Sequence, residues 1–234
     1  MRPLFFALLG VYLAYAVVTN RRPEVPAPKR AHPLTLFLQS ALFLAAAYLG
    51  WRQGVFSRDL VSPVYIAAGL FIGHLVFSLG LAFTHGVPRD ALEHFLDVPD
   101  LGRFLAECPT LLLRFAAVSF SEEVVYRAAA QTQLIAWTGR PMVSMLVVAV
   151  CFSAVHRHFL ENTWVQAAEF LAFSVLLGAL YYGTGSLSLV VVIHTVRNLE
   201  SLYLEYLEKA EQCGGTNAAL QELERQYAPR GIRQ

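Results

Sequence analysis

The stretch Ser121-Glu122-Glu123-Val124-Val125-Tyr126-Arg127 places two adjacent carboxylates and an arginine inside a chain that is otherwise suited to lipid. Charges inside a membrane are costly and need a functional reason or a tight structural one. If the stretch is helical, Glu123 and Arg127 lie four residues apart on one face and can pair. Glu122 points about 100° away from Glu123 and is left to act elsewhere. A purely structural ion cluster that locks two helices is the alternative interpretation.

The composition indicates a membrane protein. Of the 234 residues, 56% are hydrophobic and 15% are charged, whereas a soluble domain has about 25% charged residues. The net charge of +1 and the lack of a basic stripe with interleaved aromatic residues argue against nucleic-acid binding. The three cysteines are widely separated and form neither a disulfide framework nor a paired metal-binding spacing.

Apolar segments divided by polar loops and prolines predict an all-α, multi-pass transmembrane helical bundle of about seven spans. The expected spans are 3–19, 34–50, 60–83, 109–137, 141–156, 164–182 and 186–204. Residues 84–108 predict a polar loop with an amphipathic, interfacial helix, and a further amphipathic helix is expected around 217–227. The predicted domains are therefore 1–108 (N-terminal spans and amphipathic loop), 109–204 (the helical core with the charged motif) and 205–234 (a polar tail).

The first span is open to two interpretations. Ala14-Tyr15-Ala16 resembles the cleavage site of a secretory signal, but the apolar run is long for a signal peptide. The rest of the chain is also expected to be embedded, so we favour a retained span over residues 3–19. Under a seven-span topology the basic loop 20–33 and the tail lie on one side of the membrane. Their excess of Lys and Arg predicts an N-terminus outside and a tail in the cytoplasm.

Two further spans carry polar side chains at intramembrane depth. His156 ends the fifth span, and His158 reads as a loop residue or a support. His194 and Asn198 share one face of the seventh span, four residues apart. Helix rise places Glu122, His156, His194 and Asn198 about 12 to 22 Å along their helices. The four residues can therefore meet near the middle of the membrane, shifted toward its cytoplasmic half. Taken alone, each histidine has a structural interpretation, as a capped helix end or an interhelical hydrogen bond.

A carboxylate, two histidines and an amide that meet in a dry pocket suit hydrolysis. Glu122 can act as general base on a water with help from His156, while His194 and Asn198 stabilise the oxyanion of a tetrahedral intermediate. Equally, Glu122, His156 and His194 can ligate a catalytic zinc, although the His-Glu-x-x-His spacing of soluble zinc proteases is absent. We expect no cofactor, with zinc as the open alternative.

Two alternatives come from other functional classes. Intramembrane carboxylates and histidines also serve in a proton-coupled membrane transporter, but the sequence shows neither inverted repeats nor paired broken helices. A catalytically silent membrane scaffold is the second alternative.

Three motifs together resemble a known family. Glu122-Glu123-x-x-x-Arg127, Phe152-x-x-x-His156 and His194-x-x-x-Asn198 follow one another on successive hydrophobic segments. In this order they resemble the CAAX-protease and bacteriocin-processing (CPBP, or Abi) family of intramembrane endopeptidases, which includes the CAAX prenyl endopeptidase. The resemblance covers about residues 110–204. It implies an intramembrane active-site cavity, Glu122 and His156 as water-activating residues, His194 and Asn198 as the oxyanion site, and structural roles for Glu123 and Arg127.

The resemblance implies an intramembrane protease that cleaves near the C-terminus of a membrane-anchored protein or peptide. We favour a glutamate-type enzyme, with a zinc metalloprotease as the open alternative. Maturation, sorting and CAAX-like processing are the implied roles, and the substrate and the lipid bilayer are the expected partners. The short chain favours the inner membrane of a bacterial or archaeal cell. One departure concerns the middle motif, where eukaryotic relatives tend to carry a second histidine and a glycine. Here the segment reads Phe-Ser-Ala-Val-His-Arg-His-Phe, and His158 restores that pattern in part.

Overall fold

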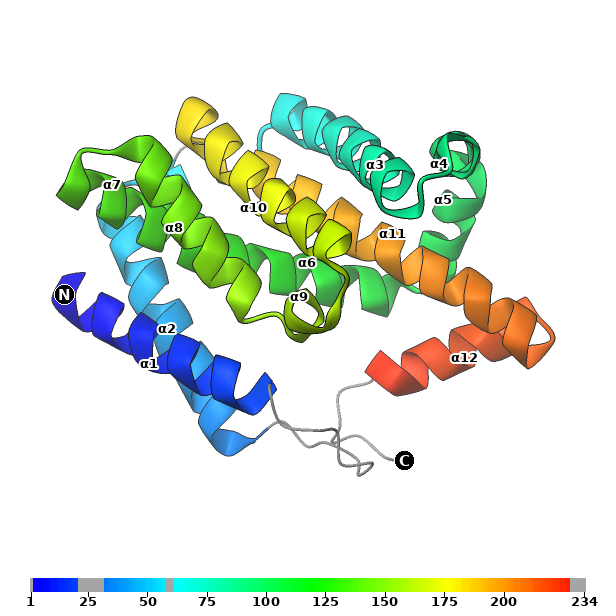
Figure 1. The fold of residues 1–234 in the computed structure, drawn as a ribbon, viewed down its shortest axis with the longest axis horizontal. Coiled ribbons are helices and arrows are strands. Elements are labelled where there is room, and N and C mark those ends of the chain that lie inside the picture. The colour runs from blue at the N-terminus through cyan, green and yellow to red at the C-terminus, as the bar shows by residue number, and fades with distance from the viewer. Residues whose placement is uncertain (1, 21–31, 58–60, 228–234) are drawn as a thin grey trace. The chain divides into compact units, whose positions relative to one another are not determined.

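The computed structural model describes residues 2–20, 32–57 and 61–227, and every regular element in these ranges is a helix (Figure 1). The all-α class expected from the sequence is thereby confirmed. Internal contacts divide the chain into two units. The first comprises Met1–Ile66 and Phe120–Val190, and the second comprises Ala67–Ser119 and Val191–Gln234.

A buried π-helix is the centre of the first unit. All residues of this helix, η2, are buried, and α2, α7, α8 and α10 pack against it. Three consecutive alanines, 128–130, leave room for this close packing. The elements of the unit are α1 (Arg2–Asn20), α2 (Pro33–Arg52), η1 (Val55–Ser57), η2 (Val124–Gln131), α7 (Thr132–Thr138), α8 (Pro141–Ala154), α9 (Arg157–Glu161) and α10 (Trp164–Thr184).

Local sequence signals explain where these helices begin and end. Proline opens α2 and α8, at a position where its missing N–H costs nothing. Thr163 opens α10 with a capping box, in which its side chain and that of Gln166 satisfy each other's backbone N–H groups. Gly139 and Gly185 end α7 and α10 with φ values of 66° and 67°, a left-handed conformation that favours glycine.

The second unit is built on two long helices. They are α3 (Pro63–His85) and α11 (Leu187–Cys213). The unit also contains α4 (Pro88–Leu96), α5 (Val98–Glu107), α6 (Pro109–Glu123) and α12 (Thr216–Tyr227). A few residues of α3, α6 and α11 belong to the first unit. A buried cluster joins α5, α6, α11 and α12 around Phe104, whose ring stacks on Tyr206 at 4.8 Å. At Gly73, an added Cβ would lie 2.8 Å from the Val196 Cβ and 3.2 Å from the Ile193 Cα. The backbones of α3 and α11 therefore approach closely at this point.

All seven expected segments are present as helices. Among the described residues, five helices are long and apolar enough to cross a membrane, namely α1, α2, α3, α10 and α11. A sixth is counted if α5 and the Pro109–Thr138 segment, which are bent by 98°, form one broken span, and α8 is a shorter apolar helix. Five or six candidate spans are roughly consistent with the expected seven. Helices of this length and hydropathy indicate an integral membrane protein.

The predicted helix over 109–137 differs from the structure in its hydrogen bonding. Instead of a plain α-helix it contains the eight-residue π-helix η2, which starts directly after Glu123. Thr132 supports the wider turn by donating its hydroxyl to the Arg127 carbonyl, five residues back, at 3.0 Å. π-helical turns are rare and occur frequently at functional sites. Most of the expected loop 20–33, residues 21–31, and the first residue of the expected third span lie outside the described residues.

Candidate active site

Glu123 and Arg127 form a fully buried ion pair. Arg127 Nε donates to Glu123 Oε2 at 3.1 Å, and both side chains are 0% exposed. A second guanidinium nitrogen donates to the Ser174 hydroxyl on α10 at 2.9 Å. The guanidinium carbon lies 5.4 Å from the centre of the Phe152 ring on α8, within the range of a cation–π contact. Arg127 thus ties η2 to α8 and α10, which is an arrangement suited to a structural role.

Glu122 lies against His156. Its Oε1 is 3.6 Å from His156 Nε2, and the two side chains are 26% and 21% exposed. Glu122 comes from the end of α6, whereas His156 follows α8 at the start of the turn into α9. The adjacent carboxylates of the Glu-Glu pair therefore have different surroundings, because Glu123 is sealed in the core and Glu122 is reachable.

Three contacts orient the imidazole of His156. Its Nδ1 is 2.7 Å from the Phe152 carbonyl oxygen, which can only accept a hydrogen bond. Nδ1 therefore carries the proton, and in the neutral ring Nε2 has its lone pair directed to the Glu122 side. The rings of Phe152 and Phe170 lie 4.5 and 5.1 Å from the imidazole. The hydrogen bond fixes the tautomer, and the two aromatic rings limit rotation of His156, which lies in the turn between α8 and α9.

His194 and Asn198 belong to the second unit. Both lie on α11, four residues apart, so they share one face of the helix. His194 is 3% exposed. Asn198 Nδ2 donates to the Ser119 hydroxyl of α6 at 3.1 Å, which fixes the direction of the amide. The sequence-based roles of these two residues and of the Glu122–His156 pair stay predictions, as does the alternative zinc set of Glu122, His156 and His194.

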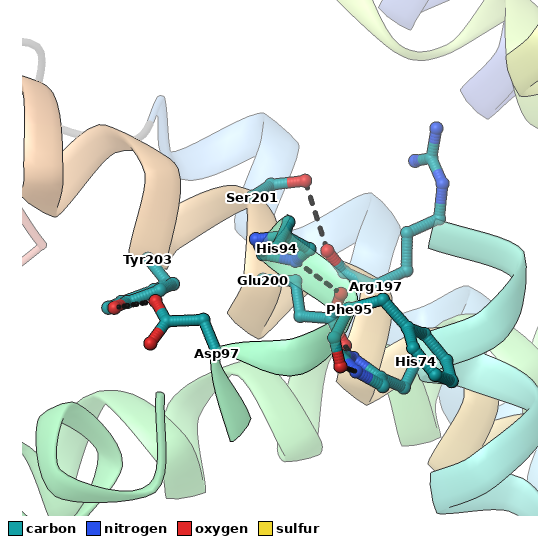
Figure 2. Close-up of polar contacts among 8 residues, drawn as sticks. All are labelled: His74, His94, Phe95, Asp97, Arg197, Glu200, Ser201 and Tyr203. Carbon is teal, nitrogen blue, oxygen red and sulfur yellow. Dashed lines mark hydrogen bonds and ion pairs between the residues drawn. The ribbon is translucent and has the colours of Figure 1, made fainter. Parts of the chain in front are cut away.

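A second polar cluster escaped the sequence analysis. His74 of α3, His94 of α4 and Glu200 of α11 converge in the second unit (Figure 2), with ligand atoms that all lie within 4.8 Å of one another. The sequence could have indicated this cluster, because His74 and Glu200 are ionisable residues within two of the expected apolar spans. Glu200 lies two residues after Asn198, just beyond the third motif.

The apolar helices indicate an integral membrane protein in which Glu122 lies against His156 between α6 and the turn after α8. Residues 104–199 match the family described as type II CAAX prenyl endopeptidase Rce1-like. This segment contains all three motifs, and the resemblance inferred from them is confirmed. The match supports a CAAX-type intramembrane endopeptidase in general terms: a protease that works in a membrane on a peptide substrate. No curated protein and no solved structure matches the chain.

Proposed function

We propose that the protein hydrolyses a peptide bond near the C-terminus of a membrane-anchored protein or peptide, with Glu122 and His156 activating the attacking water. The contact that carries this proposal is the 3.6 Å approach of Glu122 Oε1 to His156 Nε2. This separation is too long for a direct hydrogen bond. Two acceptors that hold the two protons of one water, each at about 2.8 Å, lie roughly 4.4 Å apart, so a side-chain movement of about 1 Å opens the space for that water.

The water is activated by loss of a proton to Glu122. As the water oxygen attacks the scissile carbonyl, the carboxylate takes one proton, and His156 Nε2 accepts a hydrogen bond from the other. The Phe152 carbonyl keeps the imidazole in the required tautomer by accepting from Nδ1 at 2.7 Å. When the tetrahedral intermediate collapses, the C–N bond breaks and the proton on Glu122 passes to the leaving amine. One water is consumed and both residues return to their starting states.

His194 and Asn198 are proposed to stabilise the oxyanion. An imidazole N–H and an amide N–H are neutral donors, which gain most when negative charge develops on the carbonyl oxygen. The hydrogen bond from Asn198 to Ser119 uses one amide proton, and the second amide proton is available to a substrate oxygen. Removing one donor of this kind typically lowers kcat by about 100- to 1,000-fold.

Single substitutions in protein reconstituted into liposomes test the proposal. The probes are a quenched fluorescent peptide that ends in a prenylated CAAX sequence and the same peptide without the prenyl group. We expect Glu122→Gln and His156→Gln each to lower kcat roughly 100- to 10,000-fold, the usual contribution of a general acid–base residue. Failure of the wild-type protein to cleave either peptide, or full activity of either variant, would contradict the proposal.

Matched controls separate chemistry from folding. Glu161→Gln makes the same change in an exposed carboxylate of α9, which pairs with Arg157 at 2.6 Å. His32→Gln changes an exposed histidine at the start of α2. Both controls should keep wild-type turnover. A comparison of the two peptides then reports whether the prenyl group contributes to substrate recognition.

A further inference from the structure

Three helices of the second unit place a carboxylate between two imidazoles. His74 Nδ1 lies 2.8 Å from Glu200 Oε1, and His94 Nε2 lies 3.0 Å from Glu200 Oε2 (Figure 2). The side chains of His74, His94 and Glu200 are 13%, 6% and 1% exposed. The close approach of α3 and α11 at Gly73, the residue before His74, holds the first imidazole near Glu200. The cluster is therefore built into the packing of three helices.

The contact between His74 and Glu200 requires a positive charge between the two side chains. Its Nε2 is 3.0 Å from the Phe95 carbonyl oxygen, and because a carbonyl can only accept, Nε2 carries a proton. In the neutral ring, Nδ1 then has a lone pair that faces the Glu200 carboxylate. Two acceptors at 2.8 Å need a positive charge between them, which is either a proton or a metal ion. The stacking of His74 on Phe95, with ring centres 4.9 Å apart, keeps the ring in this orientation.

The arrangement matches that of a zinc ligand set. Two imidazoles and one carboxylate form a common three-ligand zinc site, with bonds of about 2.0 to 2.2 Å and a fourth position open to water. Histidine ligands almost always donate their second ring N–H to a carbonyl or a carboxylate, as His74 does to Phe95. A tetrahedral ion with these bonds needs ligand atoms roughly 3.3 Å apart. Small side-chain rotations bring the ligand atoms, all within 4.8 Å of one another, to that spacing.

An open pocket gives a cation access to the cluster. His94 lines this pocket of about 590 Å³ together with the carboxylates Asp90, Glu93 and Asp97. Asp97 accepts a hydrogen bond from the Tyr203 hydroxyl at 2.7 Å, and Glu93 pairs with Arg89 at 2.8 Å. The negative wall attracts a divalent ion, and water in the pocket can supply the fourth ligand.

We propose that His74, His94 and Glu200 bind one zinc ion, which fastens α4 to α3 and α11. The ion replaces the shared proton between His74 and Glu200 and joins three helices through coordinate bonds. This site is separate from Glu122 and His156 in its residues and does not depend on the proposed peptidase reaction.

Metal analysis of the purified full-length protein, carrying an affinity tag without histidine, tests the site. After incubation with zinc and removal of excess metal, mass spectrometry should find one zinc per chain in the wild type and in the Glu122→Gln and His156→Gln variants. We expect His94→Gln and Glu200→Gln to lose at least four-fifths of this zinc. Glu208→Gln, an exposed carboxylate on the same helix, should keep it.

A second measurement uses only the wild-type chain, since a variant can fail to fold. Cobalt added to the metal-free protein should give the intense visible absorption of a four-coordinate ion, and zinc should abolish that absorption. Less than one-fifth of an equivalent of zinc together with no cobalt spectrum would overturn the proposal in favour of a shared proton. Loss of zinc in Glu122→Gln or His156→Gln, with retention in Glu200→Gln, would also overturn it and assign the metal to the other site.

Discussion

Replacement of Arg127 by methionine should strongly destabilise the protein. The substitution keeps much of the apolar stem and removes the guanidinium from Glu123, Ser174 and the face of Phe152. Glu123 is 0% exposed and would be left as a buried carboxylate without its arginine. Removing one partner of a buried ion pair typically costs about 3 to 5 kcal/mol. For a chain of this size each kcal/mol lowers the melting temperature by about 2 to 4 °C, so we expect a decrease of roughly 6 to 20 °C.

Thermal unfolding in detergent, monitored by the intrinsic fluorescence of the protein, measures the change. The double variant Glu123→Gln, Arg127→Met lacks both charges and should regain at least half of the lost melting temperature, since no unpaired carboxylate remains. Glu123→Gln alone should retain peptidase activity per folded molecule, because the side chain is sealed from substrate. An Arg127→Met variant that melts with the wild type would refute the structural role. So would a stable Glu123→Gln variant without activity.

Three further predictions concern the second unit. Gly73→Ala should cost about 1 to 3 kcal/mol, because its Cβ meets Val196 and the α11 backbone; a melting curve that overlays the wild type would contradict this. Cys213 is exposed and the tail is predicted to be cytoplasmic, so a membrane-impermeant maleimide should label it in inverted vesicles and not in intact cells; the opposite pattern would reverse the topology. Burial and a hydrogen bond to Glu205 raise the pKa of Tyr227 on α12 to about 12. The stabilising contribution of Tyr227 should therefore be complete below about pH 10 and lost as the pH rises through about 12. Hydrogen exchange of α12 should show this loss in the wild type, and an equal pH response in Tyr227→Phe would contradict it.

Hydrophobic segments and motif spacing predicted much of the fold. Apolar runs bounded by proline and glycine gave helix positions close to those observed, because these residues fix where backbone hydrogen bonding starts and stops. The pairing of Glu123 with Arg127 followed from their separation alone. The π-helix that carries Arg127 could not be predicted from residue spacing, because its wider turn forms where α2, α8 and α10 pack around three alanines.

The sequence predicted less of the polar interior. Glu122 and His156 were identified from the sequence as ionisable residues in apolar segments. The structure shows in addition that Glu122 Oε1 lies 3.6 Å from His156 Nε2. The orientation of His156 could not be predicted, since it rests on the Phe152 carbonyl and on two aromatic rings. The His74–His94–Glu200 cluster was missed because its members are 20 and 106 positions apart in sequence and match no metal-binding spacing. Only the packing of α4 against α3 and α11 brings them together.

We propose that Glu122 and His156 act on the same water, and a double-mutant cycle measures whether the two residues work together. The initial rate of peptide cleavage is measured for the wild type, Glu122→Gln, His156→Gln and the double variant, all at equal amounts of folded protein. Residues that act as a unit are grossly non-additive. We therefore expect the double variant to be about as slow as the slower single variant. A double variant whose loss equals the product of the two single losses would contradict it, because the residues would then act independently.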